Sequence, residues 1–392
     1  MGVGFPTRPT SPAGPTSPEM NEDKAARYHR LKRQASIASI VVSVLILAGL
    51  LATGWSIGLR AIAELAAARV VPASWQTAVS ILVYVLLLSA LNEVLGLPLG
   101  FYSGFLLERR YELSNETLGA WLADRVKAFG AGVLLGGGLA SVVYWCMRVS
   151  PERWWLLAGG AFAVLIVGLT NLAPVLLLPL FYSVKPLDRD ALRTRLLKLA
   201  DRAGARVLGA YEWGLAAKTK KANAALAGIG GTRRILVSDT MLREYSDEEI
   251  EVVLAHEIAH HVHGDIWKGI AFESILVLVG FFLASRMLAW LAQPLGLRGV
   301  DDVAGLPLLL LTAGAVSVVM VPLAHAMSRA FERRADRFAL DLTRNPAAFI
   351  SAMRRLGAQN LAEEQPSRVV QWLFYSHPPM RERIAAAEAF RI

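Results

Sequence analysis

Two residue classes are scarce in this 392-residue chain: it contains one cysteine, Cys146, and charged residues make up only 19% of it. A single cysteine excludes an internal disulfide framework, the small secreted scaffold class that depends on one, and a metal cluster built from cysteines. Soluble domains carry about 25% charged residues. The low charge, together with 54% hydrophobic residues, therefore predicts a membrane protein and excludes a fibrous or disordered one.

The N-terminal region, 1–34, is expected to be a disordered tail followed by a basic flank. Residues 1–20 are rich in Pro, Thr, Ser and Gly and show no apolar periodicity, so they bury too little surface to offset their ordering entropy. The basic flank comprises Lys24, Arg27, Arg30, Lys32 and Arg33.

Six apolar runs are near or above the roughly 20 residues that a helix needs to cross a bilayer. They cover residues 34–59, 74–100, 128–147, 154–184, 267–292 and 303–328. These runs predict a four-helix membrane region over 35–184 and a helix pair over 267–328. Pro174 and Pro179 predict that the fourth run kinks or leaves the bilayer early.

Four polar side chains interrupt the predicted spans: Asn92, Glu93, Glu273 and Arg286. Such groups usually face the interior of a bundle or a water-filled cavity. Two interpretations stay open, a cavity that admits water or hydrogen bonds between helices, and the second is slightly favoured.

The basic segments indicate the orientation. The positive-inside rule places the N-terminal flank in the cytoplasm, and six crossings return the C-terminus to the same side. The loop 108–127, the segment 185–265 and the tail after Ser328 are then cytoplasmic too. Because these segments account for the net charge of +9, no nucleic-acid partner is needed.

Residues 185–266 show the pattern of a small α+β domain. Leucines recur at helical spacing between residues 187 and 204. Strands are expected over 206–213, 221–227 and 235–238, with a turn at the glycine cluster 228–231. Ser246 and Glu249 form a capping box, which predicts a helix that begins at about Asp247.

That helix contains an H-E-x-x-H motif, whose i to i+4 spacing places His256 and His260 on one helical face. Two imidazoles and a carboxylate suit a catalytic zinc ion, because they leave one position open for water. Glu257, beside the imidazoles, is then placed to act as the general base. The alternative is a structural or solvated cluster of histidines, which also includes His261 and His263.

A third protein ligand is expected in the C-terminal segment, 329–392. Glu332 is the candidate, and Asp336, four residues later on the same helical face, can orient a ligand imidazole. Without the upstream motif, these two residues would indicate only a charged surface.

Several ordered motifs carry a family resemblance. They are PLGFYSGFLLERRYELSN (98–115), APVLLLPLFYSVKPL (173–187), NAALAG (223–228), SDTML (238–242), HEIAHHVHGD (256–265), FERRAD (331–336) and SHPPMRER (376–383). The chain resembles the integral-membrane zinc peptidases of the type I CAAX prenyl protease family and, more distantly, the heat-shock membrane protease HtpX. This resemblance implies one Zn²⁺ per chain on His256, His260 and Glu332, with Glu257 as the catalytic base.

The resemblance also implies how a substrate would bind. Asn223, Ala224 and Ala225 match an edge strand that pairs with an extended peptide, and His377 and Arg383 match positions near the scissile carbonyl. The family's eukaryotic members have seven spans around a large chamber, whereas six runs are found here.

The expected fold is a mainly α membrane protein with about six transmembrane helices and a cytoplasmic, zincin-like α+β catalytic domain that holds a small sheet and the H-E-x-x-H helix. The expected function is a membrane-embedded zinc endopeptidase that hydrolyses extended, misfolded or C-terminal peptide segments. Its partners are a peptide or protein substrate and the bilayer, in a bacterial cell membrane with the site on the cytoplasmic face. A dedicated CAAX-type processing peptidase and a non-catalytic zinc transporter or scaffold remain as alternatives.

Overall fold

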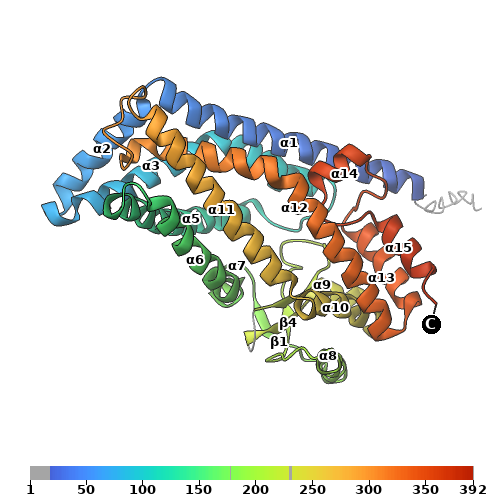
Figure 1. Cartoon of the computed structure of the whole chain (residues 1–392). Helices are drawn as coiled ribbons and strands as arrows, with labels where there is room; N and C mark the ends of the chain where they lie inside the picture. Colours follow the sequence, from blue (N-terminus) through green and yellow to red (C-terminus); the bar gives the residue numbers. More distant parts are fainter. Residues whose placement is uncertain (1–17, 177, 229–231, 392) are drawn as a thin grey trace, which may run out of the picture.

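Long helices build most of the molecule. The computed structural model describes residues 18–176, 178–228 and 232–391. The long helices are α1 (Pro18–Ala52), α2 (Trp55–Val70), α3 (Ala73–Phe101), α5 (Leu118–Val149), α6 (Trp154–Leu176), α11 (Asp265–Leu291) and α12 (Leu306–Thr343). Five described helical stretches are long and apolar enough to span a membrane, and Trp154–Thr170 is a shorter apolar one. Each of the six expected spans overlaps a different one of these helices, and the first also includes the start of α2 (Figure 1).

The described part of the region 35–184, predicted as four membrane helices, contains one further long helix, α2, which is not among the helices long and apolar enough to span a membrane. The predicted first span, 34–59, is divided where the chain turns at Gly54, which has a φ of 73°. Arg60, Glu64 and Arg69 interrupt the apolar run of α2, so a search for uninterrupted apolar stretches does not detect it.

Helix α2 packs at the end of the molecule that lies far from the sheet (Figure 1). Ser56 donates to the carbonyl of Ala304 at 2.5 Å and bonds the hydroxyl of Tyr84 at 2.6 Å. Arg60 forms a buried ion pair with Asp302 in the turn before α12. Arg60 therefore lies inside protein, which explains how its charge is accommodated in an apolar bundle, whereas Glu64 is only partly buried and Arg69 is exposed.

The disordered tail was expected to reach residue 20, but residues 18–20 already belong to α1, and the basic flank forms the next part of that helix. Tyr28 is 2% exposed and packs in a small core with Leu107 and Tyr111. The basic flank thus continues the membrane helix and contacts protein along its length, because apolar residues alternate with its charges. Residues 1–17 lie outside the described part of the chain.

A four-stranded sheet follows the first five long helices. Its strands are β1 (Val184–Pro186), β2 (Ala210–Trp213), β3 (Ala224–Ala227) and β4 (Arg234–Ser238), in the order β1-β2-β4-β3. Only the β2–β4 pair is parallel. The three expected strands are found, β2 and β3 with shorter bounds and β4 one residue longer. Strand β1 was not predicted, and most of the expected glycine turn lies outside the described residues.

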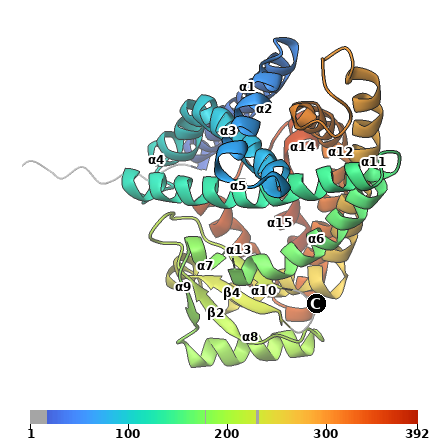
Figure 2. The ribbon, with the colours of Figure 1, turned by 90° about the vertical axis from the view of Figure 1, so that its left-hand side faces the viewer.

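The sheet lies between α8 (Asp190–Arg202) and the membrane helices (Figure 2). Leu192, Leu196 and Leu199 of α8 are buried against strand and α10 residues, which confirms the expected amphipathic helix. Gly204, with a φ of 70°, ends it in the left-handed conformation that glycine adopts without strain. This core fixes the position of α10 (Asp247–Val262), the helix with the H-E-x-x-H motif.

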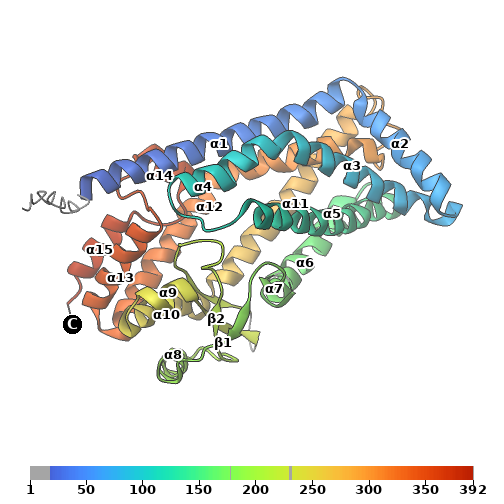
Figure 3. The same ribbon diagram turned by 180° about the vertical axis from the view of Figure 1, so that it is seen from behind.

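The C-terminal part covers the other side of α10. It comprises the end of α12 and the helices α13 (Pro346–Gln359), α14 (Arg368–Phe374) and α15 (Met380–Glu388). Helix α12 runs without a break through residue 328, where the membrane pair was expected to end. Seen from behind, α1 and α4 (Leu107–Arg110) lie beside this C-terminal part (Figure 3). The predicted boundaries 185–266 and 329–392 therefore cut through continuous packing.

Candidate metal centre

Helix α10 holds the two motif histidines rigidly. The capping box that the sequence predicts is present: Ser246 accepts from the amide of Glu249, and the Glu249 carboxylate accepts from the amide of Ser246. Apolar side chains surround the helix on almost every side, as expected for a helix that crosses a core. The ring centroids of His256 and His260 are 5.0 Å apart.

Helix α12 brings Glu332 to these imidazoles. Glu332 Oε2 lies 3.2 Å from His256 Nε2, and its Oε1 lies 3.4 Å from His260 Nε2. One ligand atom from each of the three residues can be chosen so that all lie within 4.8 Å of one another. The three residues that the sequence predicts as metal ligands are therefore brought together, although Glu332 is 72 residues beyond His260.

Asp336, one turn after Glu332, contacts the other nitrogen of His256. Its Oδ1 lies 2.8 Å from His256 Nδ1, and the same carboxylate accepts two bonds from Arg383, at 2.8 and 2.5 Å. Burial lowers the pKa of His256, but the neighbouring carboxylates of Asp336 and Glu332 outweigh it and raise the pKa to about 9. Without a metal, His256 is thus a protonated ligand held between two carboxylates.

Asp265 contacts the second nitrogen of His260, as Asp336 does for His256, and this contact was not predicted from the sequence. Its Oδ2 lies 3.1 Å from His260 Nδ1, and Lys268 and Arg334 bond its other oxygen. Gly264 makes this contact possible, because its φ of 67° ends α10 and starts α11 at Asp265. The sequence does show a carboxylate five residues after His260, but this spacing indicates a contact with the imidazole only if the chain turns at Gly264.

Glu257 and His377 flank the ligand set. Burial raises the pKa of Glu257 above its usual range, although His256 and His260 oppose the shift. His377 Nε2 lies 3.4 Å from Glu332 Oε1, and 61% of its side chain is exposed. A carboxylate and an accessible imidazole therefore lie beside the ligand cluster, as the sequence predicts.

Arg383 lies in a different place from the one expected. Two of its nitrogens bond Asp336, and Nη2 is 3.3 Å from Nδ1 of His256, on the side of the ring that faces away from Glu332. Arg383 is buried behind a ligand, so the geometry does not support its expected contact with a scissile carbonyl. It favours a role in holding Asp336.

The strand β3 lies at the edge of the sheet beside α10. Ser238 donates to the carbonyl of Asn223 at 2.9 Å, so the alternation of an antiparallel ladder turns the backbone groups of Ala224 away from β4. On that outer side, His261 Nε2 lies 2.7 Å from the carbonyl oxygen of Leu226. The edge predicted from Asn223, Ala224 and Ala225 is thus open at its start and tied to the motif helix at its end.

A cavity of about 820 Å³ lies among the membrane helices. Its lining includes the polar residues Asn92, Glu93, Arg125 and Glu273 in otherwise apolar surroundings. Arg125 Nε donates to Glu93 at 2.6 Å, and Ser43 donates to Asn92 at 3.1 Å. Of the four polar residues that interrupt the predicted spans, Asn92 and Glu93 therefore agree with both interpretations, because they form hydrogen bonds between helices and also line a cavity.

The donor set fits a divalent metal ion. Glu332 Oε2 is buried and makes no well-aligned hydrogen bond, although His256 Nε2 lies 3.2 Å away, and a cation between these two atoms would satisfy both. Two imidazoles and one carboxylate, with the second nitrogens of both imidazoles held by carboxylates, form the usual environment of a catalytic zinc site.

Comparisons with known proteins agree with this geometry. The model of peptidase family M48 matches residues 186–391, and the model described as the CAAX prenyl protease N-terminal region with five membrane helices matches residues 9–183. The described part of residues 9–183 likewise contains five long helices when α2 is counted.

Several relatives match most of the chain. An uncharacterized metalloprotease, YhfN of Bacillus subtilis, is 31% identical over 78% of this chain and 72% of its own length. CAAX prenyl protease 1 of Saccharomyces cerevisiae is 26% identical over 77% and 70%. The crystal structure of S. mikatae Ste24p, at 23% identity, shares the fold with a TM-score of 0.81 over 97% of this chain and 92% of that one.

Proposed function

The chain belongs to peptidase family M48 and is a membrane-embedded metalloprotease, and from this premise we propose that it is a zinc endopeptidase with its reaction centre at His256, His260 and Glu332. One observation carries the proposal: the two imidazoles of α10 and the carboxylate of Glu332, 72 residues beyond them, converge on one point, and one oxygen of that carboxylate is buried without a well-aligned hydrogen bond. One zinc ion per chain fits this set of donors.

Each residue has a distinct task in the proposed reaction. His256, His260 and Glu332 would hold the ion, which supplies Lewis acidity to water and to the scissile carbonyl when bound. Glu257 takes the proton of the attacking water and returns it to the leaving amine. Its raised pKa suits both steps, because a carboxylate that binds its proton more firmly is the better base. His377, accessible beside Glu332, donates to the oxyanion that develops at the carbonyl.

The substrate is an extended peptide segment that adds to the edge of β3. The outward N–H and C=O of Ala224 can pair with a peptide main chain, which recognises backbone and tolerates many side chains. Extended, misfolded or C-terminal segments meet this requirement, whereas folded segments do not offer a free main chain.

Two variants test the assignment. Glu257→Gln should retain zinc and lose peptide hydrolysis by about 10²- to 10⁴-fold, the usual contribution of a general base. Glu332→Ala should lose both zinc and hydrolysis. Metal content and cleavage of a fluorogenic peptide by the purified chain are the measurements, and unchanged proteolysis in either variant would refute the assignment.

A second candidate is a peptidase dedicated to lipidated C-terminal peptides. The relatives named CAAX prenyl protease and the largely apolar cavity of about 820 Å³ favour it. Mass spectrometry can compare the cleavage of a prenylated peptide and its unmodified twin. Equal rates would count against lipid specificity and leave the general endopeptidase.

We place the site on the cytoplasmic face of a bacterial cell membrane. The basic flank of α1 lies at the same end as the metal centre, since Arg33 pairs with Glu363 and bonds the hydroxyl of Tyr375, two residues before His377. Basic residues favour the cytoplasmic side. A cysteine introduced at the exposed Lys220 should then resist an impermeant thiol reagent in intact cells, and rapid labelling would reverse the orientation.

A further inference from the structure

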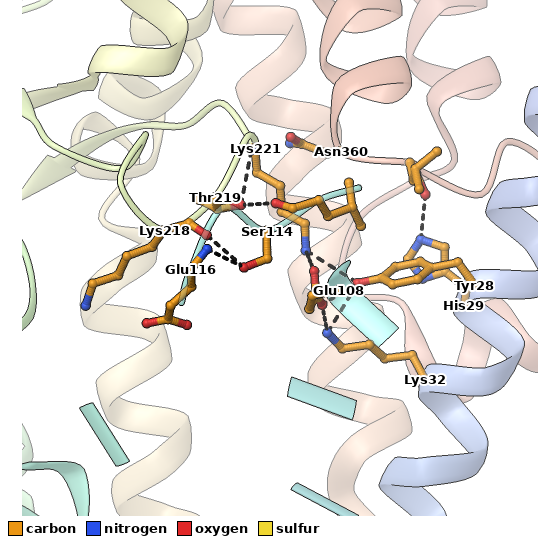
Figure 4. A network of polar contacts seen from close by, with 12 residues as sticks. Tyr28, His29, Lys32, Glu108, Ser114, Glu116, Lys218, Thr219, Lys221 and Asn360 are labelled. Atoms are coloured by element: carbon orange, nitrogen blue, oxygen red, sulfur yellow. Dashed lines mark hydrogen bonds and ion pairs between the residues drawn. The ribbon is translucent and has the colours of Figure 1, made fainter. Parts of the chain in front are cut away.

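A polar cluster outside the metal centre joins three separate parts of the chain. Glu108 of α4 accepts a hydrogen bond from the Tyr28 hydroxyl at 2.6 Å and pairs with Lys32, both on α1. Its second oxygen accepts from Lys221 Nζ at 3.0 Å. Figure 4 shows Lys32 and Lys221 approaching this one carboxylate from opposite sides. Nothing in the proposed reaction uses these groups.

Lys221 connects this polar cluster to the edge strand β3. Lys221 lies two residues before Asn223, where the chain enters the edge strand β3. The Glu108 side chain is 12% exposed, so its two ion pairs are shielded from solvent more than surface pairs are. A partly buried charged bond of this kind fixes the entry to β3 relative to α1 and α4.

The backbone around Lys221 is held by further bonds. Its carbonyl accepts from Thr240, and the amide of Ala222 donates to the Asn360 side chain at 3.1 Å. Thr219 donates to the carbonyl of Leu113, in the segment that follows α4. The start of β3 is thus set by neighbouring segments, and Glu108 is the point at which the membrane helices join this arrangement.

We propose that Glu108 is a positioning residue: through Lys221 it holds the substrate-binding edge of β3 in register with the metal centre and ties that edge to the membrane helices α1 and α4. This inference rests on the proposed function, because it takes β3 as the strand that pairs with the peptide. It predicts that loss of the Glu108–Lys221 bond weakens peptide binding and leaves the metal centre and the chemical step intact.

The chain offers a matched control for the test. Lys221→Met removes the bond to Glu108, whereas Lys220→Met removes the same charge one residue earlier from an exposed side chain. In a Glu257→Gln background, the binding of a fluorescent peptide that the wild type cleaves is measured by anisotropy. Lys221→Met should raise the Kd about tenfold, as expected for one charged hydrogen bond, and Lys220→Met should not.

Further readouts separate positioning from general stabilisation. With an active Glu257, Lys221→Met should raise KM and keep kcat, its zinc content should match the wild type, and Lys221→Arg should restore binding. Equal Kd values for the two Met variants, or a loss of zinc or kcat without a change in Kd, would overturn the proposal. If Lys221→Met does not fold, Tyr28→Phe replaces it, with an expected rise of about threefold for one lost hydrogen bond and no rise as the contrary result.

The proposed function can fail independently. A wild-type chain that binds zinc but cleaves no peptide would refute the endopeptidase. A wild type that cleaves, together with an unchanged Kd in Lys221→Met, would refute only the positioning role of Glu108.

Discussion

Two buried arginine–aspartate pairs lie at opposite ends of this molecule, and their surroundings differ. At the far end, Asp302 binds Arg60 and also accepts from the amides of Arg298 and Ala304, at 2.8 and 3.0 Å. At the metal centre, Asp336 binds Arg383 and a ligand imidazole, one turn from a carboxylate oxygen without a hydrogen-bond partner.

The comparison teaches how to recognise a site among buried charges. The pair at Asp302 is closed, since its acceptors are used within the fold and it stabilises a turn between helices. The pair at Asp336 lies behind the cluster of His256, His260 and Glu332, whose ligand atoms could all bind one cation. Buried charge alone therefore indicates stability or function equally. Both places also hold a buried atom without a hydrogen bond, Arg60 Nε at the far end and Glu332 Oε2 at the metal centre. What distinguishes them is chemistry, because a carboxylate oxygen can bind a cation and a guanidinium N–H cannot.

Removal of Asp302 from its ion pair with Arg60 should have the largest effect, and that effect should be on stability. Asp302→Ala leaves the buried Arg60 with only the partly exposed Glu64, at 4.0 Å, as a counter-charge, and loss of a buried partner typically costs about 3–5 kcal/mol. We expect a clear drop in the thermal unfolding temperature, measured by intrinsic fluorescence in detergent, while the zinc affinity of the remaining folded protein is unchanged. A loss of zinc affinity would show that the two ends are coupled.

The matched change at the other end should act on the metal. Asp336→Asn removes the charge behind His256, and such changes lower metal affinity by about 10- to 100-fold. Competition with a chelating dye measures this affinity. An affinity equal to that of the wild type would remove Asp336 from the site.

Asp265→Asn sharpens the comparison within the site. Its imidazole, His260, is 20% exposed at the side chain against 7% for His256, so solvent can replace part of the lost bond. We expect a fall in zinc affinity near the lower limit for such residues, about tenfold. A larger fall than in Asp336→Asn would contradict this reading of burial.

Proton release should give the smallest signal. His256, with a pKa of about 9, carries a proton at pH 7.5 that zinc must displace. Zinc affinity should therefore rise with pH up to about 9, and calorimetry in buffers of different ionisation enthalpy should detect released protons. Asp302→Ala should keep this proton count, and binding without release would refute the proposed protonation of His256.

The sequence predicted the motif helix well, because its signals are local. The capping box at Ser246 and the i to i+4 histidines depend on contacts within one helix, and the structure confirms the helix from Asp247. Six apolar runs also marked six long helices. Helix α2 was not predicted, because Arg60 interrupts its apolar run and the partner that accommodates this charge, Asp302, is 242 residues away in the sequence.

The sequence by itself determined the chemistry of this protein: a metal-binding face on one helix, apolar helices of spanning length, and carboxylates that can complete a ligand set. Only the tertiary structure decided how the carboxylates lie. It placed Glu332, which the sequence predicted as a ligand, between the two imidazoles, Asp336 and the unpredicted Asp265 at the second nitrogen of each ring, and Arg383 behind Asp336. The physical reason is range: helical periodicity acts over four residues, whereas the packing of α10 against α12 and the turn at Gly264 set every other distance in the site.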